Sequence, residues 1–323
     1  MTNFQIYKKT LGFSLRRVLI DFLTLILFAC LIAAGYFILE KVNGNGMIGL
    51  LIGLFAAIIA AVIISRFVSF KLKAGQIAMM TKGVTEGELP DDVIAAGKNV
   101  VKERFITVAA YFAVTGAIKG VFNELGRLLT KAGERLGGET GKTVGSIVSS
   151  AVATLISYLC DCCLGWVFYS KDKGAFKASC EGAVLFFKHG KALLKNVGRI
   201  FGIGLLSFVV IGGVFFLIFA LILSNFMEFF QTMAVWLAEN AESAEEFPDL
   251  LKDPQMLMIG SSILLAVIIW SFLHSTFIRP FVLTGVLRNY MEAGINDMPT
   301  EESFESVKNV SRKFAKLAEK ADA

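Results

Sequence analysis

The chain has 323 residues, of which 55% are hydrophobic and only 18% are charged, and its formal net charge is +5. A soluble domain carries about 25% charged residues, so the composition excludes an ordinary soluble domain and predicts a membrane protein. The basic residues collect beside apolar runs, which speaks against nucleic-acid binding. Because the alternating pattern of a membrane barrel does not occur, we expect an all-α, polytopic fold.

Two apolar runs near the N-terminus predict a transmembrane hairpin over residues 1–70. The first run, 18–39, reads "VLIDFLTLILFACLIAAGYFIL", and the link "EKVNGNG" joins it to the second run, 47–70. A helix needs about 20 apolar residues to cross a bilayer. The connector that follows, 71–104, is basic and contains the helix-start signal "PDD". By the positive-inside rule, the N-terminus and this connector are cytoplasmic.

A second transmembrane pair is expected over residues 200–283, with an acidic outside loop at 225–255. The segment before it, 170–199, and the tail after it, 284–323, are both rich in lysine. Both termini are therefore predicted to be cytoplasmic, in a plasma or inner membrane.

The number of spans depends on residues 105–169, because both flanks of this segment are predicted to be cytoplasmic. Residues 105–118 are free of charge, but a polar stripe at spacing four follows, so this helix either lies along the membrane surface or lines a bundle. Residues 143–169 are long enough to span. We predict about six spans; the alternative is four spans plus re-entrant or interfacial helices. The stripe consists of Lys119, Asn123, Arg127 and Lys131.

One ridge of the 143–169 helix is small and ends at a carboxylate. Small residues at spacing four allow neighbouring helices to approach closely. An ionisable residue inside a span also predicts a functional site, so the ridge is a candidate substrate path on which Asp161 attracts a cation or relays a proton. Alternatively, Asp161 pairs with a basic residue such as Lys119 or Arg127 and is structural. The ridge consists of Gly145, Ser149, Ala153, Ser157 and Asp161.

The stretch "YLCDCCLGW", 158–166, holds three of the five cysteines. No four Cys or His residues have the spacing of a structural zinc site, and the C-x-x-C pair does not begin a helix after a strand. We interpret the thiols as apolar packing groups and predict neither a metal nor another cofactor. The chain lacks a catalytic triad pattern and H-E-x-x-H, and in "GERLGGETGKTVGS" the first glycine of a phosphate loop is replaced by Leu136. We therefore predict that the protein is not an enzyme.

Segment 170–199 combines apolar residues with regularly placed lysines, a pattern typical of a helix that binds the anionic leaflet of a bilayer. Arg279, which precedes Pro280 at the end of the last predicted span, is expected to reach the cytoplasmic headgroups. The predicted membrane-surface contacts are Lys177, Lys188, Lys191, Lys195, Arg199 and Arg279.

From Cys160 onward, the order of segments resembles the C-terminal part of the choline transporter-like family. A Cys-rich span end is followed by "FKASCEGAVLFFKHGKALLKNVGRI", a Gly/Phe-rich span, an outside loop and a last span leading into "FVLTGVLRNYMEAGIN". The resemblance covers residues 143–296, whereas the family has more spans and a different acidic closing segment.

The resemblance implies that the protein moves choline-like amines, with aromatic side chains contacting the ammonium group and Asp161 supplying the countercharge. The alternative function is a non-catalytic scaffold or accessory subunit of a larger membrane complex. The predicted partners are the lipid bilayer and either a second copy or other membrane subunits.

Overall fold

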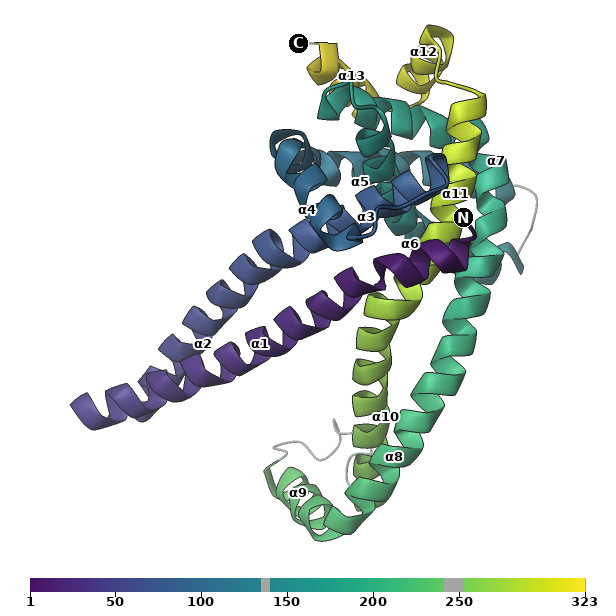
Figure 1. Cartoon of the computed structure of the whole chain (residues 1–323). Helices are drawn as coiled ribbons and strands as arrows, with labels where there is room; N and C mark the ends of the chain where they lie inside the picture. The colour runs from purple at the N-terminus through teal and green to yellow at the C-terminus, as the bar shows by residue number, and fades with distance from the viewer. Residues whose placement is uncertain (135–139, 241–252, 323) are drawn as a thin grey trace. The chain divides into compact units, whose positions relative to one another are not determined.

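The computed structural model describes residues 1–134, 140–240 and 253–322, and every regular element within them is helical (Figure 1). The all-α prediction is confirmed. The chain forms two compact units: the first contains residues 1–198 and 280–323, and the second contains residues 199–279. For some helical residues the description covers the backbone alone; these are 43, 65, 66, 114, 125–134, 140–153, 190–197, 237–240 and 322.

Helices α1 (Asn3–Asn43) and α2 (Gly46–Ile64) form the predicted hairpin and run side by side in Figure 1. Gly44 ends α1 with a φ of 67°, a left-handed conformation that glycine adopts without strain. Where the helices touch, a Cβ added to Gly35 or Gly49 would overlap the carbonyl oxygen of the other glycine. The two backbones are therefore in direct contact, as small residues allow.

Beyond α2 the chain continues through a π-helical turn, η1 (Ser65–Ser69), into α3 (Phe70–Thr85), and α4 (Val93–Glu103) follows. The carboxylate of Asp92 accepts hydrogen bonds from two backbone N–H groups in the first turn of α4. Such a cap satisfies donors that have no partner inside the helix. The helix start predicted from "PDD" is thus confirmed.

Within the first unit, α3 contacts α1, α4 and α6 (Thr140–Tyr169). The unit contains several large aromatic side chains with less than 2% exposure, including Trp166, Tyr111 and Tyr290. At its far end, the Ser311 hydroxyl donates a hydrogen bond of 2.7 Å to a Glu124 carboxylate oxygen, which anchors the last helix. The helices that complete the unit are α5 (Phe105–Glu134), α6 (Thr140–Tyr169), α7 (Ala175–Ser207) up to residue 198, α11 (Arg279–Asn296) from residue 280, α12 (Glu301–Val310) and α13 (Arg312–Asp322).

The N-terminus is fastened to α11 within this unit. The Arg288 guanidinium donates hydrogen bonds of 2.6 Å to the Asn3 side chain and 2.7 Å to the Met1 carbonyl oxygen. The start of the chain and α11 are therefore joined within one unit, while the side of the membrane on which they lie stays a prediction.

The second unit is built on α8 (Gly213–Leu223) and α10 (Pro254–Leu273), which lie side by side (Figure 1). The Trp270 indole donates a hydrogen bond of 3.2 Å to the Ser207 hydroxyl. Part of the predicted outside loop is helical, because α9 (Met227–Asn240) covers residues 227–240. The other elements here are η2 (Phe208–Gly212), η3 (Ser224–Phe226) and η5 (His274–Ile278).

Four helical stretches in the described residues are long and apolar enough to cross a membrane: Asn3–Val42, Gly46–Thr85, Gly198–Trp236 and Pro254–Asn296. A fifth results if the bent pair Phe105–Ala113 and Thr115–Glu124 is counted as one span. The chain is therefore a polytopic integral membrane protein. The preferred number of six exceeds this set, and the four-span alternative agrees with it.

The difference arises at α6. The part of α6 whose side chains are described, Thr154–Tyr169, is a shorter apolar helix. Its residues from Leu155 to Phe168 are buried by neighbouring helices of the first unit, apart from half-buried Ser157. An apolar composition fits a helix surrounded by other helices as well as one surrounded by lipid, so the described part of α6 is not counted as a span, and a crossing by the whole of residues 143–169 stays a prediction.

Candidate functional site

Asp161 lies on α6 in the interior of the first unit. The Nζ atom of Lys73, on α3, is 2.6 Å from an Oδ1 oxygen of Asp161, and the two side chains are 33% and 8% exposed, respectively. Sequence reasoning anticipated a pairing of this kind but named other partners. Of these, Lys119 is exposed, and the side chain of Arg127 lies outside the described residues.

A second buried carboxylate, which sequence reasoning missed, lies on α7. Glu181 is 5% exposed; one of its oxygens is 2.7 Å from the Lys173 Nζ atom, and the other accepts a hydrogen bond of 3.0 Å from the Trp166 indole. The sequence did hold a signal, because Glu181 is the sole acidic residue between Asp172 and Glu228. Buried charges need such partners, because desolvation of an isolated carboxylate is costly.

Four cysteines lie buried with these carboxylates as free thiols: Cys160, Cys162, Cys163 and Cys180. Burial, with a further contribution from the Asp161 charge, raises the pKa of the Cys162 thiol. That thiol stays protonated at neutral pH and is a poor nucleophile. Among the described residues, no group of three or more His, Cys, Asp or Glu side chains could hold a metal ion.

Two tyrosine hydroxyls and one glycine pack against the segment that carries the thiols. The Tyr111 hydroxyl donates to the carbonyl oxygen of Cys160, and the Tyr290 hydroxyl donates to that of Gly182 over 2.7 Å. A Cβ on Gly182 would lie 2.6 Å from the Cys163 sulfur and 2.8 Å from the Tyr290 oxygen, so a larger residue would force these side chains to move. These contacts fix α6 against α5, α7 and α11.

Arg104 holds the C-terminal end of α6. Its guanidinium donates hydrogen bonds to the carbonyl oxygens of Val167, Phe168, Ser170 and Lys173. The last carbonyls of a helix have no partner within it and carry the negative end of the helix dipole. Sequence reasoning counted Arg104 only as a connector charge, because its acceptors lie more than 60 residues away.

Only part of the predicted substrate path is described at the level of side chains. Ser157 is half-buried and Asp161 is buried and paired. The side chains of the other three path residues, Gly145, Ser149 and Ala153, lie outside the described residues. The path stays a prediction.

The predicted membrane-surface residues differ in their surroundings. The Lys188 Nζ atom is 2.5 Å from the Asp297 carboxylate, which neutralises its charge. Of the remaining contacts, Lys177 and Arg199 are exposed, Arg279 is half-buried, and the side chains of Lys191 and Lys195 lie outside the described residues.

A cavity of about 580 Å³ opens beside Lys73. It is also lined by Arg17 and Lys71, so its charge is positive, and much of the remaining wall is aromatic. The phenylalanines that line it are Phe67, Phe70, Phe105 and Phe112.

Comparison of the chain with protein-family models, with curated proteins and with solved structures finds no match.

Proposed function

We propose that the protein is a non-catalytic membrane scaffold or accessory subunit, in which long apolar helices hold a packed helical bundle at the bilayer. The observation that supports this proposal is the ion pair between Lys73 and Asp161. A transport path for a cation needs an available carboxylate, whereas this carboxylate is neutralised within the chain. The partners expected for a scaffold are a second copy or other membrane subunits.

The second buried ion pair, between Lys173 and Glu181, supports the same proposal. Buried ion pairs contribute little net stability, because desolvation offsets much of their attraction. We infer that the two pairs in this bundle select one arrangement of helices over others, because a misplaced helix leaves a charge without its partner. A rigid and specifically packed bundle is what a scaffold requires.

Transport of a small choline-like cation is the second candidate function. The aromatic part of the cavity beside Lys73 supports it, because phenylalanine rings attract cations, whereas Arg17 and Lys71 in the same wall oppose the entry of a cation. In this mechanism the arriving cation displaces Lys73 from Asp161 and takes its place against the carboxylate. The ion pair would then open once in each transport cycle.

A double-mutant cycle separates the two functions. If the pair is structural, Asp161→Asn lowers the free energy of unfolding by about 2 kcal/mol, because it leaves the Lys73 ammonium without its partner. Combining it with Lys73→Met restores most of that loss. The matched control is Glu86→Gln, which breaks the exposed Lys82–Glu86 pair and should cost at most about 0.5 kcal/mol.

Choline uptake into proteoliposomes completes the test. A scaffold gives the same uptake as protein-free vesicles. The scaffold proposal is wrong if the wild-type protein takes up choline and Asp161→Asn stops the uptake while the melting temperature is unchanged.

A further inference from the structure

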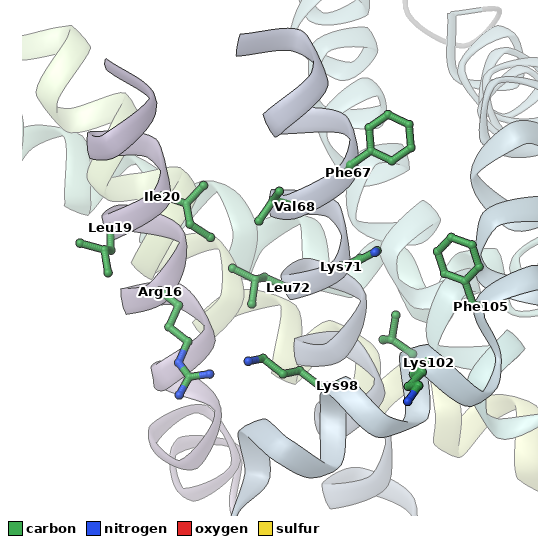
Figure 2. Close-up of a pocket in the computed structure, with 11 residues that line it drawn as sticks. Arg16, Leu19, Ile20, Phe67, Val68, Lys71, Leu72, Lys98, Lys102 and Phe105 are labelled. Carbon is green, nitrogen blue, oxygen red and sulfur yellow. The ribbon is translucent and has the colours of Figure 1, made fainter. Parts of the chain in front are cut away.

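A larger cavity, of about 910 Å³, lies between α1, the η1–α3 segment and α4 in the first unit (Figure 2). Its volume is within the range of about 300–1,000 Å³ that is typical of ligand sites. Much of its wall is apolar and includes Leu19, Ile20, Phe67 and Val68.

Four cationic side chains line the same cavity: Arg16, Lys71, Lys98 and Lys102. No acidic residue lines it, and none of the four forms an ion pair with a carboxylate in the described part of the chain. In Figure 2 the Arg16 guanidinium and the Lys98 amine point toward each other across the gap between α1 and α4. Cations gathered beside low-dielectric walls focus a positive potential, which attracts an anion.

The cavity lies where the surface of α1 changes character. On the N-terminal side of Arg16, Phe13 is buried in the bundle while Leu15 is 54% exposed; beyond Arg16, Leu19 and Phe22 are 57% and 59% exposed. The long apolar run of α1 starts at Val18, two residues after Arg16, and is therefore next to the cavity. In a transmembrane helix, the boundary between an apolar run and basic residues is the level of the lipid headgroups.

Lys71 links the charged and apolar parts of the cavity. Its Nζ atom lies 5.2 Å from the centre of the Phe105 ring, a cation–π contact. The amine is thus held at the apolar wall. There it can contact the headgroup of a lipid molecule whose acyl chains lie against Phe67 and Val68.

We propose that this cavity binds one anionic phospholipid, with the phosphate between Arg16 and Lys98 and the upper acyl chains along the apolar wall. A soluble phosphate would use the cations but would leave the apolar wall in contact with water. A zwitterionic lipid would cover the wall but would bring a positive headgroup amine close to four cations. The site is separate from Asp161 and does not depend on the scaffold proposal.

Native mass spectrometry of the full chain in detergent tests the proposal, with phosphatidylglycerol, phosphatidylcholine and inorganic phosphate as probes. We expect one tightly bound phosphatidylglycerol and a raised melting temperature with that lipid alone. Equal retention of phosphatidylcholine, or an equal thermal shift with inorganic phosphate, would overturn the proposal.

Two variants locate the binding. Arg16→Gln combined with Lys98→Gln should weaken retention of phosphatidylglycerol about 25-fold, since each basic residue near an anionic headgroup contributes about 1 kcal/mol. Lys316→Gln combined with Lys320→Gln, which removes two exposed charges from α13, should leave retention unchanged. Equal retention by the Arg16/Lys98 variant and this control contradicts the site.

Val68→Trp tests the cavity without altering charge. The indole occupies space at the wall, so we expect bound phosphatidylglycerol to be lost while the melting temperature of the lipid-free protein is unchanged. Undiminished binding of the lipid would show that it lies elsewhere.

Discussion

The α1–α2 hairpin and the bundle around α6 and α7 are both rich in apolar residues, but different contacts hold them together. In the hairpin, the backbones touch at Gly35 and Gly49, and long apolar side chains project outward from both helices. In the bundle, two buried carboxylates each have a lysine amine within 2.7 Å. In lipid, the hydrophobic effect does not drive helices together, so the hairpin depends on close packing of its helix surfaces. In the bundle, by contrast, buried polar groups must have partners.

The largest loss of stability is expected from Gly49→Leu, which disrupts the contact between α1 and α2 in the hairpin. A Cβ at this position overlaps the Gly35 carbonyl oxygen, so the helices must separate, at an expected cost of about 3 kcal/mol. Thermal unfolding in detergent measures the loss. The matched control is Gly213→Leu, since nothing lies within 4 Å of a Cβ there; an equal loss in both variants would contradict a specific glycine contact.

Glu181→Gln tests the bundle side, with an expected loss of about 2 kcal/mol in the free energy of unfolding. The amide can still accept a hydrogen bond from the Trp166 indole but leaves the Lys173 ammonium without a countercharge. Denaturant unfolding gives the value. The control is Glu86→Gln, which breaks the exposed pair with Lys82. An equal loss of unfolding free energy in this variant would contradict the inference that burial makes the Lys173–Glu181 pair important for stability.

The smallest effect concerns Asp297, an exposed residue that pairs with Lys188 at the edge of the bundle. The hydrogen bond from Lys188 holds the pKa of this carboxyl below its ordinary value of 3.8, with further lowering by the charges of Lys188 and His189. Because the pKa is lower in the folded state, the stabilisation is present above 3.8 and is lost as the pH falls through the folded-state pKa.

Melting temperatures of the wild type and Asp297→Asn, measured from about pH 5 to about pH 3, check this expectation. The wild type should have a small advantage at the upper end that shrinks toward the lower end. An advantage that grows as the pH falls would reverse the inferred sign.

Local signals in the sequence predicted local structure well. Gly44 marks the end of α1, and Asp92 caps α4, because each acts on its own backbone or on residues two or three positions away. The partners of the buried carboxylates were harder to predict. Lys73 and Asp161 are distant in sequence and meet only because α3 packs on α6, and no short-range pattern specifies that packing.

The number of spans shows a related limit. Charge counting treats each apolar run between basic segments as a crossing. Residues 143–169 satisfy that rule, yet the described part of this segment, Thr154–Tyr169, is buried mainly by other helices of the first unit. Asp161 is buried and paired with Lys73, and its place on a substrate path stays a prediction. Whether such a charge faces water or a lysine depends on the fold of the whole unit.

The π-helical turn Ser65–Ser69 places one additional residue between the hairpin and the bundle. Each residue of an α-helix turns the chain by about 100°, so α3 is rotated by roughly that angle relative to an uninterrupted extension of α2. The glycine face of α2 and the buried face of α3 therefore point in different directions around one continuous helical stretch, Gly46–Thr85. Deleting one residue from the turn would shorten this stretch only slightly, but it would direct the Lys73 side chain away from α6.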